Sequence, residues 1–372
     1  MQATEKATKE SVQSTWAKRP LIISGPCSAE TEEQVLQTAQ RLAATGRVDM
    51  LRAGIWKPRT KPGMFEGVGA DGLPWLQMAK KITGLPVTVE VATAKQVEDA
   101  LKFEVDVFWI GARTTVNPFS VQELADALRG TDVPVLIKNP INPDLELWTG
   151  AVERIARAGV KQIGLIHRGF SSYGNTEYRN APMWHLAIEM KLKHPDMLMI
   201  NDPSHICGRR DILLEVAQKA IDLDYDGLMI ESHIDPDNAW SDAKQQVTPE
   251  RLKEMLDAII WRKEDINSDE YHAALEKLRQ QINHLDDELM QILGQRMKTA
   301  EQIGKYKREN NITILQTSRW NEIIERAFMK GDRLGLSKEF ITKYFDAVHM
   351  ESINHQKKVM DSPLSPPDGG GT

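Results

Sequence analysis

Residues 198–231 read LMINDPSHICGRRDILLEVAQKAIDLDYDGLMIE, and this stretch decides the class of fold. Its first and last runs, Leu198–Asn201 and Gly227–Glu231, are short and mostly apolar, as buried β-strands are. The segment between them, Arg210–Ala220, is compatible with a helix. A strand followed by a helix and a second strand predicts a βαβ unit, in which the two strands are parallel.

The same alternation of strand and helix begins near Leu21 and continues to Trp261. Six more apolar runs precede the quoted stretch: Leu21–Gly25, Met50–Trp56, Val87–Val91, Val107–Gly111, Val133–Lys138 and Gln162–His167. Segments compatible with helices follow them, among them Thr31–Thr45, Ala94–Phe103, Ser120–Leu128 and Leu147–Ala158. Eight such units in roughly 240 residues predict a (β/α)8 barrel, also called a TIM barrel. A doubly wound open sheet is the alternative, because a count of strands does not show that the sheet closes.

The pattern changes after Trp261, where signals for strands disappear. Apolar residues then recur at alternating spacings of three and four, which is the heptad pattern of a packed helix; they are Leu275, Leu278, Ile282, Leu285, Leu289 and Ile292. This helix can extend to about Glu309, and two more helical segments follow near Ser318–Met329 and Lys338–Lys358. We therefore expect a barrel domain over residues 1–262, a linker over 263–270, an all-α domain of three helices over 271–360 and a disordered tail over 361–372.

The composition is typical of a soluble globular protein, with 41% apolar and 27% charged residues, and a length of 372 residues predicts two domains. The net charge of −6 disfavours a nucleic-acid partner that binds a basic surface. The two cysteines, Cys27 and Cys207, exclude a disulfide framework and favour a reducing compartment. The N-terminus is polar, and no apolar run approaches the ~20 residues of a membrane helix. We therefore expect a cytoplasmic protein with neither nucleic-acid nor membrane partners.

Barrel enzymes carry their chemistry at the carboxyl ends of the strands. Four side chains at or beyond the predicted strand ends are candidate metal ligands, namely Cys27, His205, Glu231 and Asp242. One thiolate, one imidazole and two carboxylates suit a divalent transition metal such as Mn²⁺, Fe²⁺, Co²⁺ or Zn²⁺. Because no two of them have the compact spacing of a metal motif, a buried structural cysteine and a capping histidine are the alternatives.

A second set near the strand ends is cationic and consists of Arg52, Lys57, Arg59, Arg113, Lys138 and Arg168. Six cations at one barrel mouth would repel one another without a strongly anionic ligand, and two phosphorylated substrates would provide that charge. Solvated surface charge is the alternative for each residue taken singly. It does not explain the group, because the residues adjoin strand ends rather than helix faces. Glu90, in the third predicted strand, adds a carboxylate.

Short motifs occur in one order through the first domain: Gly25–Ser28, Leu51–Arg52, Lys57–Thr60, Ile110–Arg113, Leu136–Lys138, His167–Gly169, Asp202–His205, Gly208–Arg210, and Glu231 followed by Ser241–Gln245. Together they resemble the type I 3-deoxy-D-arabino-heptulosonate-7-phosphate (DAHP) synthases. That family joins phosphoenolpyruvate to erythrose 4-phosphate in the first step of the shikimate pathway. The sister family, the 3-deoxy-D-manno-octulosonate-8-phosphate synthases, uses arabinose 5-phosphate and is the alternative. Its members carry a different motif where this chain has Lys57–Thr60.

The resemblance implies a role for each candidate residue of the barrel. The metal ligands would be Cys27, His205, Glu231 and Asp242. Phosphoenolpyruvate would be held by Arg52, Lys57, Arg113, Lys138 and Arg168, and erythrose 4-phosphate by Lys57, Arg59 and Thr60. Lys57, Glu90 and Lys138 would take part in catalysis, with Glu90 orienting the water that attacks phosphoenolpyruvate.

The long helix of the second domain carries charges on its apolar seam. Arg296 stands at a heptad position where leucine is expected, and Lys307 follows three turns later on the same face. Arg279 lies one residue off the seam, and Ser352 and Gln356 share a face of the last helix. A solvated basic helix with a snorkelling arginine is the alternative to an anion site.

These positions belong to a longer series: Leu278–Arg279, Asp286, Gln295–Arg296, Gly304–Lys307, Arg319, Ser352 and Gln356. The series resembles the all-helical chorismate mutases, which are intertwined homodimers. The resemblance implies that Arg279 of the second chain, with Arg296, Lys307 and Arg319, binds the carboxylates and ether oxygen of chorismate. Gln356 would contact the ether oxygen, with Ser352 nearby, and Arg296, Lys307 and Gln356 would be catalytic.

Two positions depart from the chorismate mutase pattern. Many members have acidic residues beside the arginine corresponding to Arg319, where this chain has Gln316 and Trp320. Two functions of the helical domain are therefore possible from the sequence: a mutase of reduced turnover and a purely regulatory domain. Fusion of an early and a late enzyme of one pathway favours feedback, in which prephenate or chorismate bound to the helical domain restrains the barrel.

Overall fold

The structure is a computed structural model that describes residues 12–58, 62–174, 177–262, 268–315 and 317–361. Contacts divide the chain into two compact units, residues 1–264 and 265–372. The first unit contains eight parallel strands: β1 (Leu21–Gly25), β2 (Met50–Arg52), β3 (Val87–Val91), β4 (Val107–Ile110), β5 (Val135–Lys138), β6 (Ile163–His167), β7 (Leu198–Asn201) and β8 (Gly227–Glu231).

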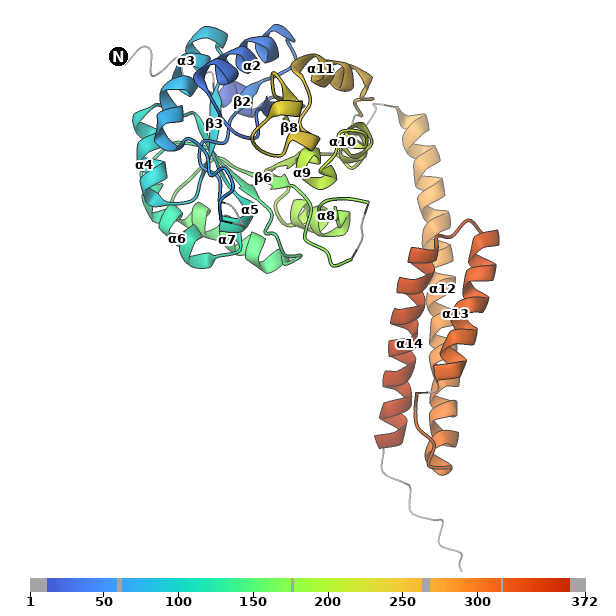
Figure 1. The fold of residues 1–372 in the computed structure, drawn as a ribbon. Coiled ribbons are helices and arrows are strands. Elements are labelled where there is room, and N and C mark those ends of the chain that lie inside the picture. The colour runs from blue at the N-terminus through green and yellow to red at the C-terminus, as the bar shows by residue number, and fades with distance from the viewer. Residues whose placement is uncertain (1–11, 59–61, 175–176, 263–267, 316, 362–372) are drawn as a thin grey trace, which may run out of the picture. The chain divides into compact units, whose positions relative to one another are not determined.

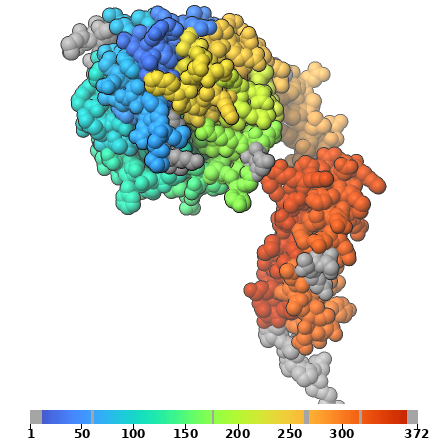
Figure 2. Space-filling view, viewed as in Figure 1, coloured from blue at the N-terminus to red at the C-terminus, as the bar shows by residue number. Residues whose placement is uncertain are grey.

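These strands form one closed barrel in the order of the sequence. The last strand pairs with the first, with Leu21 opposite Gly227 and Gly25 opposite Glu231. The chain therefore runs once around the barrel, and its colours pass from blue through cyan and green to yellow in Figures 1 and 2. Closure confirms the (β/α)8 barrel and excludes the doubly wound open sheet.

Helices surround the strands of this unit (Figure 1). They are α2 (Glu32–Ala44), α3 (Leu73–Thr83), α4 (Ala94–Lys102), α5 (Ala112–Thr115), α6 (Pro118–Ala127), α7 (Leu145–Arg157), α8 (Trp184–Lys193), α9 (Pro203–Cys207), α10 (Leu213–Asp222) and α11 (Pro249–Ala258). Side chains cap several of them; Thr31, for example, accepts the N–H of Gln34 at the start of α2.

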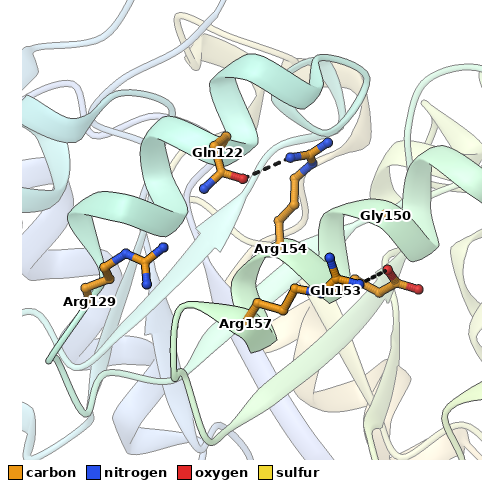
Figure 3. A pocket seen from close by; sticks show the side chains of 6 residues that line it. All are labelled: Gln122, Arg129, Gly150, Glu153, Arg154 and Arg157. Carbon is orange, nitrogen blue, oxygen red and sulfur yellow. Dashed lines mark hydrogen bonds and ion pairs between the residues drawn. The ribbon is translucent and has the colours of Figure 1, made fainter.

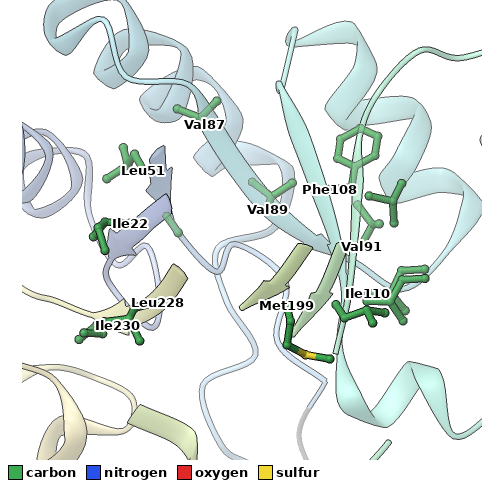
Figure 4. Close-up of a cluster of buried hydrophobic side chains, with 14 of the residues drawn as sticks. Ile22, Leu51, Val87, Val89, Val91, Phe108, Ile110, Met199, Leu228 and Ile230 are labelled. Atoms are coloured by element: carbon green, nitrogen blue, oxygen red, sulfur yellow. The ribbon is translucent and has the colours of Figure 1, made fainter. Parts of the chain in front are cut away.

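Alternation along the strands produces two apolar layers. Leu21 and Ile23 of β1 belong to the cluster that fills the barrel, together with Trp109. Ile22, between them, belongs to the larger cluster between strands and helices, part of which Figure 4 shows. Because both faces of each strand are buried, the strands read in the sequence as continuous apolar runs.

The strand limits differ from the prediction chiefly at β2, which ends at Arg52 rather than Trp56. The chain turns away at Gly54, where a Cβ atom would lie 2.4 Å from the carbonyl oxygen of Cys27, so this close approach requires glycine. The apolar residues that follow β2 are thus buried in a loop, a distinction that hydrophobicity alone does not make.

The second unit consists of α12 (Asp269–Glu309), α13 (Thr317–Arg333) and α14 (Lys338–Asp361). Helix α12 begins at Asp269, two residues before the predicted start, because Ser268 caps it by accepting the N–H of Tyr271. At Gly304 an added Cβ atom would lie 3.0 Å from the Cα of Gln356, so glycine permits α12 and α14 to approach closely here.

Most of the predicted heptad seam is exposed in the single chain; Leu278, Ile282, Leu285, Leu289 and Ile292 have exposed fractions between 42% and 61%. The buried residues of α12 all lie farther along the helix, from Met297 onward. No helix in the part of the chain that the structure describes is long and apolar enough to cross a membrane. Residues 263–267 of the predicted linker and 362–372 of the predicted tail lie outside the described residues.

Candidate active sites

The carboxyl ends of the barrel strands bring together side chains that are far apart in the sequence. Because Gly25 lies opposite Glu231, Cys27 extends from β1 beside the end of β8. His167 of β6 lies opposite Asn201 of β7, and the N–H of Asp202 donates to the carbonyl of His167. The edge therefore gathers residues from β1, β6, β7 and β8.

The four candidate metal ligands meet in two pairs. Sγ of Cys27 lies 3.1 Å from Oδ2 of Asp242, and Nε2 of His205 lies 3.8 Å from Oε1 of Glu231. Burial, followed by the negative charges of Glu231 and Asp242, raises the pKa of the Cys27 thiol to about 12. A thiol in this setting becomes a ligand only when a cation replaces its proton.

Side-chain cations lie against these ligands. Nζ of Lys57 donates to Sγ and to the carbonyl oxygen of Cys27 at 2.7 and 2.6 Å. Nη1 of Arg179 lies 2.9 Å from Oδ1 of Asp242. Among the described residues, no three His, Cys, Asp or Glu side chains are grouped so that they could hold a metal ion.

The donor set nevertheless fits a metal ion in its chemistry. Oε1 of Glu231 is buried and accepts no hydrogen bond from any residue that the structure describes, although Nη2 of Arg52 lies 3.3 Å away. Such an oxygen suits a cation as its further partner. The thiol, imidazole and carboxylates at this edge are also the mixed ligand types that a transition metal accepts.

Asp202 connects the candidate metal ligands with the cationic set. Its Oδ2 atom lies 2.8 Å from Nζ of Lys138 and 2.8 Å from Nδ1 of His205. Burial raises the pKa of this carboxyl, but His205 and Lys138 outweigh burial and hold the pKa well below its usual range. Because Nδ1 of His205 faces Asp202, Nε2 is the nitrogen available to a metal ion.

Arg52 and Lys138 share one aromatic surface inside the barrel. The Cζ atom of Arg52 lies 4.9 Å from the centre of the Trp109 ring, and Nζ of Lys138 lies 5.8 Å from it. Arg52 is 1% exposed, and its Nε and Nη1 atoms are buried without hydrogen-bond partners in the described parts of the chain. These two donors match the oxygens of an anionic ligand. Glu90 lies beside them and accepts the indole N–H of Trp109 at 3.2 Å.

Arg168 is buried at the end of β6. Burial, with the positive charges of Arg179 and Arg113 adding to it, lowers the pKa of Arg168 to about 10, although Asp202 acts in the opposite direction. The effect places Arg113, which is itself exposed, within electrostatic reach of Arg168. The structure thus brings Arg52, Lys57, Lys138, Arg168 and Arg113 to one end of the barrel. The predicted residues Arg59 and Thr60 lie outside the described residues.

Four residues of this site were not predicted as site residues: Asp202, Asn139, Arg179 and Gln245. Asn139 accepts the N–H of Arg168 at 2.7 Å, and Gln245 joins Arg179 to Glu231 through two bonds of 2.6 Å. Asp202 and Gln245 stand within the quoted motifs, so their sequence context was a usable signal. Arg179 comes from a loop before α8, and its sequence context gave no signal that it belongs to the site.

In the helical unit, Arg296, Ser352 and Gln356 lie together where α12 packs on α14. Nη1 of Arg296 donates to Oγ of Ser352. Ser352 and Gln356 are buried, and Oε1 of Gln356 has no hydrogen-bond partner within the described residues of this unit. Lys307 donates to the carbonyl of Ile314 at 2.5 Å.

The other predicted residues of this unit are placed differently. Arg279 is exposed on α12. Arg319 is 65% exposed and pairs with Glu322 at 2.7 Å rather than with the cluster around Arg296. Gln316 lies outside the described residues. The ring of Trp320 stacks on that of His349, with ring centres 4.3 Å apart.

A further cationic hollow of about 320 Å³ lies on the outside of the barrel between α6 and α7 (Figure 3). Its lining includes Arg129, Arg154 and Arg157. Arg154 donates to Gln122 at 2.9 Å and Arg157 pairs with Glu153 at 3.3 Å, so neighbouring helix residues engage these arginines. The hollow contains none of the predicted site residues.

Two family models match this chain, one for each unit. The DAHP synthetase I family matches residues 4–268, and chorismate mutase type II matches residues 278–357. Phospho-2-dehydro-3-deoxyheptonate aldolase of Thermotoga maritima is 33% identical over 235 residues, which cover 63% of this chain and 67% of that protein. The 2-dehydro-3-deoxyphosphooctonate aldolase of Desulfatibacillum aliphaticivorans is 29% identical over 256 residues, or 64% of this chain and 90% of that protein.

Solved structures give the same result for the barrel. The crystal structure of the Thermotoga maritima DAHP synthase superimposes with a TM-score of 0.57 and 31% identity, over 64% of this chain and 67% of that one. Fold and comparisons define a (β/α)8-barrel enzyme fused to a helical mutase domain. The chain belongs to the DAHP synthetase I family and carries a chorismate mutase type II domain at its C-terminal side. It thus combines a transferase and an isomerase domain of the shikimate pathway.

Proposed function

We propose that the barrel condenses phosphoenolpyruvate with D-erythrose 4-phosphate to DAHP and phosphate, and that the reaction requires a divalent metal. The observation that carries the proposal is the gathering of buried cations beside a thiol, an imidazole and carboxylates at one end of the barrel. Arg52 and Lys138, which share the Trp109 surface, would hold the phosphate and carboxylate of phosphoenolpyruvate, because their donors suit anionic oxygens. Lys57, Arg113 and Arg168 would complete that site.

The second substrate would bind through Lys57, Arg59 and Thr60. C3 of phosphoenolpyruvate then attacks the aldehyde carbon, water adds at C2, and phosphate leaves as the C–O bond breaks. Glu90, held by the indole N–H of Trp109, would orient that water. The cations would hold the two substrates close together in the orientation for reaction, which lowers the entropic part of the activation barrier.

Cys27, His205, Glu231 and Asp242 would hold the metal, which can be Mn²⁺, Fe²⁺, Co²⁺ or Zn²⁺. When bound, such an ion acts as a Lewis acid on the aldehyde oxygen. Asp202 would fix the ring of His205 so that Nε2 is presented, since its carboxylate engages Nδ1.

Rates of phosphate release with both substrates test this proposal on the full chain. We expect Arg168→Ala to lower kcat/KM by about 100-fold, the cost of removing one charge-stabilising donor from an active site. Arg154→Ala, in the remote hollow, is the matched control and should leave the rate unchanged. Equal losses in both variants would contradict the proposed site. Higher turnover with arabinose 5-phosphate than with erythrose 4-phosphate would instead favour the sister reaction of the 29% identical relative.

We propose that the helical domain converts chorismate to prephenate as a homodimer. Its support is the cluster of Arg296, Ser352 and Gln356 together with the exposed apolar seam of α12. The rearrangement needs no covalent step, so the domain has to hold the reactive conformer and stabilise charge on the ether oxygen. Arg296, Lys307 and Gln356 would do so, with Arg319 and, from the second chain, Arg279 binding the carboxylates.

We also infer that prephenate bound to the helical domain inhibits the barrel. Inhibition requires prephenate to favour one arrangement of the two domains over another. The test compares synthase rates with and without prephenate in the full chain and in a chain that ends at Arg262. Inhibition that persists in the shortened chain would contradict this inference. If the full chain binds prephenate tightly but does not convert chorismate, the domain is purely regulatory.

A further inference from the structure

His349 on α14 is a half-buried polar residue that none of the functions above uses. Its Nε2 atom is buried and has no hydrogen-bond partner among the described residues. An unpaired imidazole nitrogen within a helical unit costs free energy, so a ligand atom is the natural candidate for its partner.

The position of His349 puts it at the proposed mutase site. It precedes Ser352 by three residues and Gln356 by seven, so all three share one face of α14. Its charged surroundings come from two helices, with Arg296 and Lys307 of α12 and Asp346 of α14 within electrostatic reach. The two candidate catalytic cations of α12 therefore act electrostatically on this imidazole.

Trp320 of α13 packs against the ring of His349. The ring centres are 4.3 Å apart and the planes differ by 32°, which is a tilted stack that restrains the imidazole. An indole donates one N–H and accepts no hydrogen bond, so Trp320 cannot perform the role of a carboxylate. It can, however, orient a neighbour that does accept.

The protonation state of His349 determines which group of a ligand its ring can bind. Burial, then Arg296 and to a smaller extent Lys307, lowers the pKa of His349, against the opposing effect of Asp346. The ring is neutral near pH 7, so it presents one donor and one acceptor. Carboxylates suit the neighbouring cations, whereas a neutral imidazole suits an uncharged hydroxyl. Chorismate contains one hydroxyl group, and no other residue of the proposed site is assigned to it.

We propose that His349, held by Trp320, binds the ring hydroxyl of chorismate and is a substrate-binding residue of the mutase site. This proposal rests on the proposed mutase function, and it adds a specificity determinant to it. Many chorismate mutases have an acidic residue at the position of Trp320. In this chain His349, packed against Trp320, would provide a neutral hydrogen-bonding group instead.

The test uses His349→Phe in the full chain, because phenylalanine keeps a ring against Trp320 and removes both nitrogens. We expect kcat/KM for chorismate to fall about tenfold or more, since the hydroxyl loses its partner. His349→Gln, which retains a donor and an acceptor, should stay within about threefold of the wild type. His355→Phe is the matched control, because it removes a histidine of the same helix that bonds to Glu301.

A chorismate analogue with hydrogen in place of the hydroxyl distinguishes the loss of a hydrogen bond to that hydroxyl from a general disturbance of the site. Calorimetric affinities for this analogue should be equal in the wild type and in His349→Phe, whereas affinities for chorismate should differ. Equal losses for both ligands, or no loss for chorismate, would overturn the proposal. A wild-type chain that binds chorismate without converting it would contradict the mutase activity, while the affinities would still decide the role of His349.

Discussion

Replacing Asp202 with asparagine removes the one carboxylate that Lys138 and His205 share, while it preserves the size of the side chain. Asp202 is fully buried, and its carboxylate receives Nζ of Lys138 and Nδ1 of His205, each at 2.8 Å, as well as the backbone N–H of His205. Asparagine can still cap α9 through its carbonyl oxygen. It cannot neutralise Lys138 or fix the orientation of the imidazole.

The expected cost has two parts. Removing one partner of a buried ion pair destabilises a protein by about 3–5 kcal/mol, and Lys138 is only 5% exposed at its side chain, so little solvent screens it. Losing a carboxylate behind a metal-binding histidine weakens metal affinity by about 10- to 100-fold. We therefore expect a lower free energy of unfolding together with weaker binding of Mn²⁺ and of phosphoenolpyruvate.

Urea unfolding gives the first quantity, and titrations of the folded variant with Mn²⁺ and with phosphoenolpyruvate give the others. Asp106→Asn is the matched control. Asp106 is also a buried carboxylate paired with a lysine, Lys80 at 2.7 Å, but it precedes β4 at the opposite end of the strand from the site. Both variants should lose stability, and only Asp202→Asn should lose affinity for the two ligands. Unchanged affinities in Asp202→Asn would refute the idea that this carboxylate organises both parts of the site.

Three further changes have defined outcomes. Cys27→Ser should lose bound metal and synthase activity together, as metal analysis and rates will show; full activity without metal would contradict the assignment. Leu285→Asp, at a seam position that is 61% exposed, should convert the expected dimer to a monomer in sedimentation experiments, whereas Gln281→Asp should not. Burial lowers the pKa of His167 to about 4, so the unfolded chain binds a proton below about pH 6.5 that the folded chain does not, and the free energy of unfolding should fall by about 3 kcal/mol between pH 6.5 and 4. His167→Phe should flatten that part of the pH profile, and an unchanged slope would contradict a neutral, buried His167.

The barrel was largely predictable because its strands are buried on both faces. Continuous apolar runs such as Val87–Val91 and Gly227–Glu231 predicted strands with the limits that the structure shows. The run after Met50 was misjudged, because buried loop residues carry the same apolar signal as a strand. The apolar seam of α12 was equally predictable, because a heptad repeat identifies the apolar face of a helix whether or not a partner covers it.

The candidate residues of the barrel were predictable by type, because ionisable groups at strand ends have few structural reasons to be there. Their partners were not. Asn139 and Gln245 are uncharged amides, and their roles follow only from hydrogen bonds to Arg168 and Glu231. His349 is a similar case, because its significance depends on the stacking of Trp320 from another helix.

The sequence by itself determined the two classes of domain and the strand ends that carry the chemistry, because periodicity and local motifs depend on residues close together in the chain. Only the tertiary structure decided that the sheet closes, that Asp202 joins Lys138 to His205, and that Nε2 of His349 has no hydrogen-bond partner among the described residues. These facts depend on register and burial between residues up to about two hundred positions apart, which no local pattern specifies.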